Sequence, residues 1–160
     1  LDLIIDCEGL FKSDTYFVEH SLETQLPFIR KAFERNVRIL PLVVGTGENI
    51  PKIMKILWNK KEIGFVFSTD LSHYLNTDEC KKEDKKTIKA IENLNGDLLN
   101  PDMLCGYEAI KGLLDFAKNN KLIIKNISYG NSANITNENT AVGYGSFVIM
   151  NNKILYSNNL

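Results

Sequence analysis

Two short and almost uninterrupted apolar runs constrain the fold of this chain more than any other feature. Residues 37–44 read VRILPLVV and residues 63–67 read IGFVF, with glycines or polar residues following each run. Runs of this length without regular polar alternation are typical of strands that are covered on both faces. The pattern therefore predicts two buried strands of an α/β sheet, with a helix at residues 50–59 packed against them.

Helical and extended patterns alternate along the rest of the chain. Amphipathic helices are expected at residues 20–35, 50–59, 77–93 and 104–119, and further strands at residues 121–129, 141–150 and 153–156. Pro27 predicts an irregular backbone between His20 and Pro27. Thr77 is the expected cap of the third helix, whose lysine-rich first half should be solvated. This order predicts one domain over residues 1–160, a three-layer α/β sandwich with a mixed, mainly parallel central sheet.

Composition and charge exclude several classes of function. The chain has 160 residues, 44% of them apolar, and its 19 basic and 20 acidic side chains give a net charge of −1. Because these charges are interspersed, we expect no surface for nucleic acid or for an anionic membrane. No apolar run approaches the roughly 20 residues of a membrane span, and no secretory leader is recognised. We expect a cytoplasmic protein, and the initial Leu1 predicts that the chain begins inside a longer gene product.

The densest polar cluster, STDLSHY at residues 68–74, directly follows the second apolar run. Ligand sites of open α/β sheets favour the carboxyl ends of strands. His73 can bind a metal or transfer a proton, and Asp70 can fix its tautomer or stabilise its charged form. The same serine and aspartate side chains are equally suited to tying the loop backbone and capping the next turn. Residue types alone leave both interpretations open.

A second polar cluster consists of Glu19, His20 and Glu23, at the start of the first expected helix. His20 and Glu23 fall opposite the apolar stripe of that helix, so they are placed to line a cavity. The alternative is structural, with Glu23 favoured by the helix dipole and His20 acting as a capping residue.

Cys105 stands at the expected start of the helix at residues 104–119, where the local positive potential favours a thiolate that binds metals or attacks electrophiles. Buried cysteines are nevertheless more often small apolar residues. Cys7 and Cys80 are interpreted as structural, and without a Cys-x-x-Cys pair neither a disulfide framework nor a zinc ribbon is expected. Dinucleotide, P-loop and nucleophile-elbow motifs are absent. Two histidines and one thiol are few for a catalytic metal site, which uses three protein ligands and an open position.

Four segments together resemble the Memo family: EHSLETQLPF at residues 19–28, STDLSHY at residues 68–74, LCG at residues 104–106 and AVGYGSF at residues 141–147. They occur in the family's order and span nearly the whole chain. The resemblance implies an α/β fold related to the class III extradiol dioxygenases, with a metal-binding cleft. It also implies that an N-terminal portion with further histidine ligands and strands is missing, which predicts an exposed apolar sheet edge.

The resemblance also implies roles for individual residues. Cys105 and His73 match metal-site positions, and the implied cofactor is a transition metal, with iron favoured over copper or zinc. The candidate catalytic residues are His73, His20 and Asp70. The candidate substrate-binding residues are Glu19, Glu23, Ser68 and Tyr74. A small molecule or a peptide is the expected occupant of the cleft, and an oligomer is compatible with the sequence.

Three functions follow from these residues. The leading hypothesis is a metal-dependent oxidoreductase or dioxygenase-like enzyme, although dioxygenase chemistry rests on fold analogy alone. A second hypothesis is a non-catalytic module that binds a peptide or another ligand in the same cleft. The third is a nucleophilic enzyme that uses Cys105 activated by His73, which requires the two side chains within hydrogen-bond reach.

Overall fold

The computed structural model describes residues 20–33, 37–136 and 138–151. Glu19, Cys7 and the strand expected at residues 153–156 lie outside these ranges. The helices are α2 His20–Phe33, α3 Ile50–Leu57, α4 Thr77–Glu92, α5 Tyr107–Asn119 and α6 Ala133–Thr136, with short 3-10 turns η2 Gly47–Asn49 and η3 Gly96–Leu98. The strands are β1 Leu75–Asn76, β2 Leu122–Asn131, β3 Thr140–Ala141 and β4 Gly143–Asn151. This mixture of helices and strands confirms the α/β class.

The strand pairs within the described ranges are small and antiparallel, whereas a mainly parallel sheet was expected. β2 pairs with β4 along its whole length, with an irregularity between Asn126 and Ser128, and β1 pairs with β3. A two-stranded antiparallel ribbon needs only a local connection, whereas parallel strands need partners from distant parts of the chain. Those partners are not found among the described residues.

Residues 37–44 and 63–67 are not strands of a ladder, which corrects the prediction of strands buried on both faces. At the end of each segment, successive side chains alternate between a packed face and an open face, as extended backbone requires. The first half of residues 37–44 is exposed throughout. Phe65 and Phe67 pack against the core, whereas Val66 between them is 59% exposed. In the same way Val44 contacts the core, whereas Val43 is 53% exposed. In the described part of the chain, neither segment is buried on both faces.

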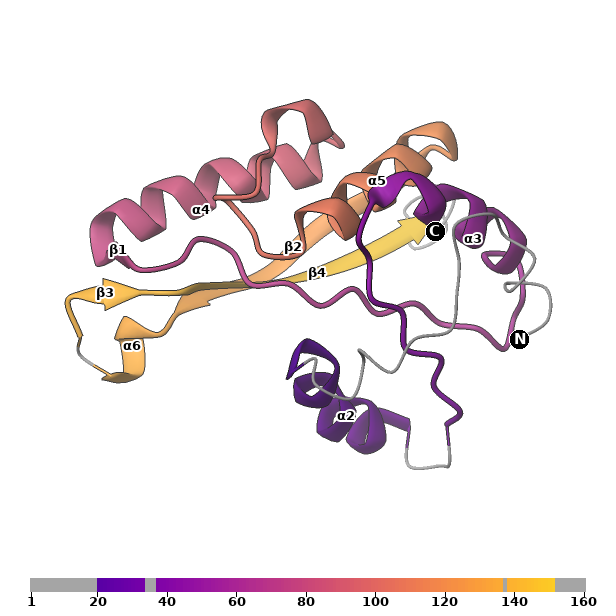
Figure 1. Ribbon diagram of the computed structural model, residues 1–160, viewed down its shortest axis with the longest axis horizontal. Helices are drawn as coiled ribbons and strands as arrows, with labels where there is room; N and C mark the ends of the chain where they lie inside the picture. Colours follow the sequence, from indigo (N-terminus) through magenta and orange to yellow (C-terminus); the bar gives the residue numbers. More distant parts are fainter. Residues whose placement is uncertain (1–19, 34–36, 137, 152–160) are drawn as a thin grey trace, which may run out of the picture.

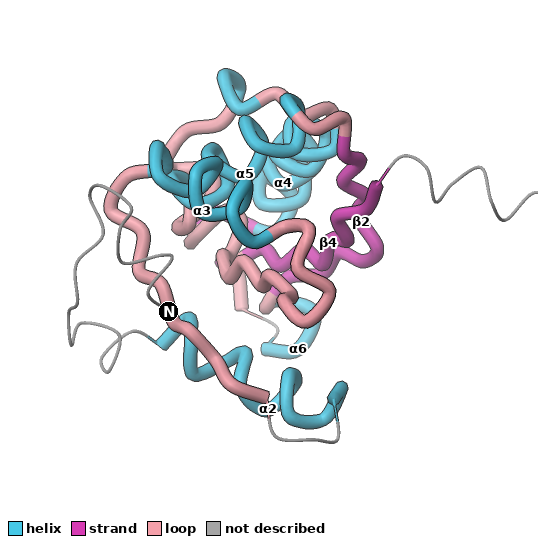
Figure 2. The backbone as a smooth tube through the Cα atoms, turned by 90° about the vertical axis from the view of Figure 1, so that its right-hand side faces the viewer, coloured by secondary structure: helices cyan, strands magenta, loops and turns pink. Residues whose placement is uncertain are grey.

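The core lies between the β2–β4 ribbon and a layer of three helices, α3, α4 and α5, on one of its faces (Figures 1 and 2). Its fully buried members include Met54, Leu104, Leu114 and Ile124, which come from each of these layers. Gly47 and Gly112 let α5 approach the start of α3, because a Cβ on either glycine would overlap backbone atoms of the facing segment. No helix in the described ranges is both long and apolar enough to cross a bilayer.

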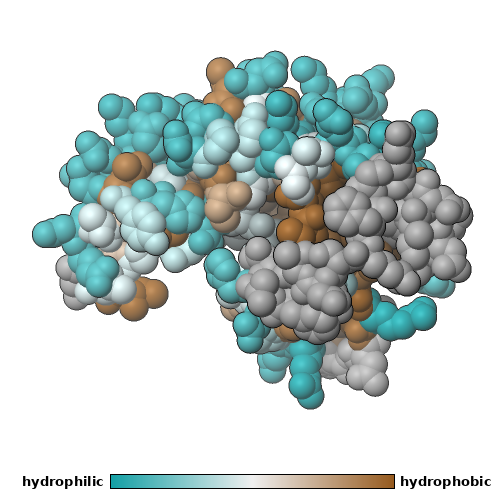
Figure 3. All heavy atoms as spheres, viewed as in Figure 1, coloured by the Kyte–Doolittle hydropathy of each residue, from teal (hydrophilic) through white to brown (hydrophobic). Residues whose placement is uncertain are grey.

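Helix α2 lies on the other side of the ribbon from α3, α4 and α5, and none of its residues is buried (Figure 1). Contrary to prediction, the helix runs without interruption through Pro27. The expected apolar stripe of this helix is only partly covered: Leu22 and Ile29 are half-buried, whereas Leu26 is 44% exposed and Phe33 is 50% exposed. Figure 3 shows apolar surface open on this side of the molecule between α3 and α2.

Candidate metal centre

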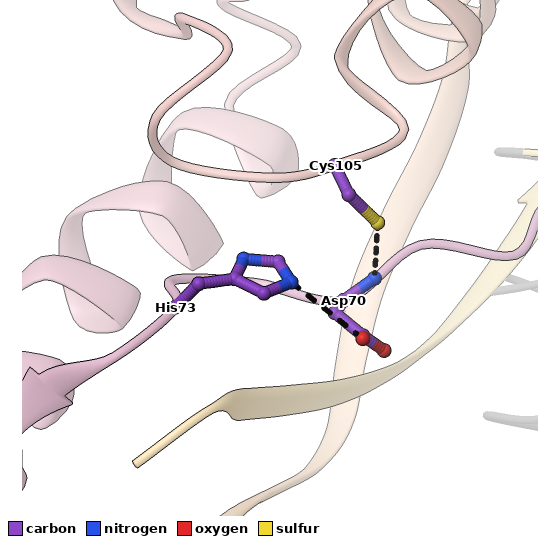
Figure 4. Close-up of side chains that lie close together, drawn as sticks. All are labelled: Asp70, His73 and Cys105. Atoms are coloured by element: carbon purple, nitrogen blue, oxygen red, sulfur yellow. Dashed lines mark hydrogen bonds and ion pairs between the residues drawn. The ribbon is translucent and has the colours of Figure 1, made fainter. Parts of the chain in front are cut away.

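Three side chains with metal-binding atoms converge in the described structure: Asp70, His73 and Cys105 (Figure 4). One ligand atom from each lies within 4.8 Å of the others. The His73 Nε2 atom is 3.7 Å from the Asp70 Oδ2 atom, and the backbone N–H of Asp70 donates to the Cys105 Sγ atom at 3.2 Å. The sequence-predicted residues of the polar cluster and of the helix start therefore come together at one place.

A close approach between two loops produces this convergence. The N–H of Gly106 donates to the Thr69 Oγ1 atom at 2.8 Å, and that hydroxyl lies 3.5 Å from the Cys105 sulfur. A Cβ at Gly106 would lie 2.8 Å from the Thr69 Cβ and 3.2 Å from the Ser68 carbonyl oxygen. Only glycine fits at this position, so Gly106 and Thr69 bring the segment after the second apolar run against the start of α5. Helix α5 begins at Tyr107, slightly later than predicted, which places Cys105 just before the helix.

An open pocket of about 460 Å³ adjoins the cluster and is lined by His73, Leu75, Pro101, Asp102 and Cys105. The side chains of His73 and Asp70 are 32% and 40% exposed, and Cys105 is exposed as well. Two of the three cluster members thus face a space that a small molecule can enter. The wall combines apolar groups with a carboxylate, a mixture common in small-molecule sites.

The donor set suits a transition metal. An imidazole nitrogen, a thiolate sulfur and a carboxylate oxygen are the ligand types that zinc and related ions take from proteins. Ligands bound at about 2.0–2.3 Å to a tetrahedral ion lie about 3.3–3.8 Å apart. The His73–Asp70 distance of 3.7 Å already falls in this range. The remaining separations, all within 4.8 Å, would have to contract by at most about 1.5 Å.

The other sequence-predicted site residues are not part of the cluster. His20 and Glu23 lie on the exposed face of α2, and Glu19 falls outside the described ranges. Ser68 accepts a hydrogen bond from the Gln25 side chain of α2 at 3.1 Å. Tyr74 is 78% exposed, adopts a φ of 56°, and has its ring centroid 6.0 Å from that of His73. A positive φ is uncommon for a bulky residue, so Tyr74 marks a sharp turn beside the cluster.

Sequence reasoning missed several residues that support the site. Asp84, expected on a solvated stretch of helix, is fully buried behind the cluster. A signal was available, because Cys80, Asp84, Thr87 and Ile91 recur at i, i+4, i+7 and i+11, the spacing of one buried helical face. Tyr144 was also missed. Partial desolvation, together with the nearby Asp70 carboxylate, raises the pKa of its phenol, although the side chain is 46% exposed.

Comparison with known proteins identifies the family. The family model described as "Memo-like protein" matches residues 8–148. The chain belongs to the Memo family. Its Memo relatives include MEMO1 family proteins of Methanosarcina barkeri, 28% identical over 146 residues, and Thermoplasma acidophilum, 30% identical over 159 residues. A third, from Aquifex aeolicus, is 34% identical over 85 residues.

The Memo relatives are longer than this chain. The match covers 82% of the chain and 55% of the Methanosarcina barkeri protein, and 88% of the chain and 59% of the Thermoplasma acidophilum protein. For the Aquifex aeolicus protein the corresponding shares are 50% and 32%. The chain therefore spans little more than half the length of the first two, and it contains the Memo segments that carry Asp70, His73 and Cys105.

Proposed function

We propose that Asp70, His73 and Cys105 form a transition-metal site, and that the adjoining pocket admits a small molecule to the bound metal. The observation that carries this proposal is the convergence of three different ligand atoms within 4.8 Å, beside a pocket lined by two of the three residues. Three protein ligands with an open side are the arrangement of catalytic metal sites, whereas structural sites are closed.

The chain's own residues would have distinct roles. Cys105 would supply a thiolate, and the N–H of Asp70, which donates to its sulfur, would stabilise the negative charge there. His73 would bind through Nε2, the atom nearest Asp70. Leu75 and Pro101 would exclude water from part of a ligand, and the Asp102 carboxylate would disfavour an anion.

A bound iron ion would supply a Lewis-acidic and redox-active centre with free coordination positions, and this is the basis for proposing an oxidoreductase. The set differs from the usual iron site of two histidines and one carboxylate, because a thiolate replaces one imidazole. Dioxygenase activity toward catechols is the most specific form of the proposal, and it rests on the resemblance in fold. Oxygen-electrode measurements on the iron-loaded protein test it, and absence of oxygen uptake with a panel of catechols would reject that form.

Metal binding itself is tested by titration calorimetry and elemental analysis with Fe²⁺ and Zn²⁺. We expect one ion per chain, and loss of binding in Cys105→Ala and His73→Gln. His20→Gln is the matched control, because His20 lies on α2 and outside the cluster. If His73→Gln and His20→Gln bind metal equally well, the assignment of His73 is wrong. Failure of the unaltered chain to bind any ion contradicts the proposal for this chain.

A second function, nucleophilic chemistry at Cys105, is favoured by one observation: its exposed sulfur accepts an N–H from Asp70 at 3.2 Å and lies 3.5 Å from the Thr69 hydroxyl. Donors to sulfur stabilise the thiolate that attacks electrophiles. The expected result is alkylation of Cys105 by iodoacetamide at neutral pH faster than that of glutathione. A rate equal to that of glutathione would exclude this function.

A further inference from the structure

A buried polar network lies directly behind the candidate metal centre. Its centre is Asp84 of α4, which is fully buried and accepts hydrogen bonds from three donors. The backbone N–H of Ser72 donates to Oδ1 at 2.9 Å, while the Tyr129 hydroxyl at 2.8 Å and the Cys80 thiol at 3.2 Å donate to Oδ2. Three donors facing two oxygens match a carboxylate, since a carboxylate only accepts.

The network joins three elements that are distant in sequence. Asp84 and Cys80 come from α4, Tyr129 comes from β2, and Ser72 belongs to the segment that carries His73. The Ser72 hydroxyl also donates to the Cys80 sulfur at 3.4 Å. Burial raises the pKa of the Tyr129 hydroxyl and of the Cys80 thiol, so both groups keep the protons that they donate.

The ribbon holds the same segment from another side. Leu71 donates its N–H to the Gly143 carbonyl, and Gly143 donates its N–H to the Ser72 carbonyl, both at 2.9 Å. Gly143 also touches Asp84, because a Cβ at this position would overlap the carboxylate group. The backbone of Leu71 and Ser72 is therefore fixed between α4 and β4. These two residues lie between Asp70 and His73, the cluster members that must be held 3.7 Å apart.

We propose that Asp84 is a positioning residue, which acts through the Ser72 N–H to hold Asp70 and His73 in the geometry that meets Cys105. This inference rests on the proposed function, because the residues that Asp84 would position are proposed metal ligands. Residues that orient metal ligands without touching the ion commonly change metal affinity by roughly 10–100-fold when they are altered. Asp84 acts differently from a residue that bonds a ligand side chain. It accepts the backbone N–H of Ser72, which lies between the proposed ligands Asp70 and His73.

Asp84→Asn is the principal test. The amide has nearly the same shape, but its NH₂ group cannot accept, so at least one of the donors that face the two Asp84 oxygens loses its acceptor in either orientation of the amide. We expect a loss of Co²⁺ affinity of roughly 10–100-fold, measured by the sulfur-to-metal absorption band. Asp115→Asn, an exposed carboxylate on α5 with the same change of charge, is the matched control and should bind Co²⁺ like the unaltered chain.

Tyr129→Phe is the second variant, because it removes one donor from Asp84 and retains the ring. We expect a smaller loss of Co²⁺ affinity than in Asp84→Asn. If Asp84→Asn does not fold, Tyr129→Phe decides the question. Unchanged Co²⁺ affinity in a folded Tyr129→Phe, or in a folded Asp84→Asn, would overturn the proposal.

A metal-free measurement separates this proposal from the proposed function. The chain has two histidines, so the ¹⁵N and ¹H signals of the His73 ring can be assigned with His20→Gln. In both network variants we expect the His73 ring signals to shift, while those of His20 stay unchanged. If the unaltered chain does not bind Co²⁺ and the His73 signals still shift, the metal function fails and the positioning role stands. If the His73 signals do not move in either folded variant, the positioning role is wrong.

Discussion

The contact between Gly106 and Thr69 makes Gly106→Ala the most informative substitution near the site. The φ of Gly106 is −87°, so alanine meets no backbone penalty and any effect must come from the added methyl group. That methyl would lie 2.8 Å from the Thr69 Cβ and 2.9 Å from its Oγ1, closer than van der Waals contact allows. The loop at residues 68–70 must therefore move away from Cys105.

Forcing one carbon into a close-packed contact costs about 1–3 kcal/mol. For a chain of 160 residues this corresponds to a lowering of Tm by roughly 2–12 °C. The hydrogen bond from Gly106 to Thr69 should be lost, and metal affinity should fall because Asp70 moves with the loop. Circular dichroism melting and Co²⁺ titration measure the two effects.

Gly64→Ala is the control, since a Cβ at Gly64 would meet nothing within 4 Å. It should melt and bind metal like the unaltered chain. If Gly106→Ala matches Gly64→Ala in both measurements, the loop contact does not determine the site geometry, and this part of the reasoning is refuted.

Three further predictions concern the core, the ribbon and the open face. Leu114→Ala should cost about 2–5 kcal/mol in unfolding free energy, because Leu114 is 1% exposed; a cost below about 1 kcal/mol in urea unfolding would contradict its place in the core. The raised pKa of Tyr129 means that the folded state retains a proton which the unfolded state loses above the ordinary value of 10.0, so stability should fall as pH rises past 10.0. In thermal unfolding at alkaline pH, Tyr129→Phe should therefore lose less stability per pH unit than the unaltered chain. An equal loss in the two proteins would contradict this prediction. Val43→Thr with Val66→Thr should lower binding of an apolar dye and self-association, since both valines are more than half exposed; equal dye fluorescence would show that this face is not accessible.

Local patterns in the sequence predicted the helices and the ribbon well. Helix α4 begins at the predicted residue, although the capping side chain is that of Asn76, which accepts the N–H of Glu79, and not that of Thr77. The ends of β2 and β4 also lie within about two residues of prediction, a usual margin for element boundaries. Periodicity and capping depend on neighbours in sequence, which explains this success.

Pairing was harder to predict because it depends on distant residues. The apolar run at residues 63–67 predicts burial, but it does not indicate which of its two faces is covered. In the structure Val66 is exposed. Asp70 and His73 belong to one short polar segment, so their proximity could be predicted from the sequence alone. Bringing Cys105 to them required a tertiary contact through Thr69 and Gly106, which no local pattern encodes.

The central claim is that Cys105, His73 and Asp70 bind one metal ion, and X-ray absorption spectroscopy of the zinc-loaded chain tests it most directly. The account predicts one sulfur neighbour at about 2.3 Å and nitrogen or oxygen neighbours at about 2.0–2.2 Å. The sulfur contribution should disappear in Cys105→Ala. A coordination shell of nitrogen and oxygen alone, or a sulfur contribution that persists in Cys105→Ala, would contradict the account.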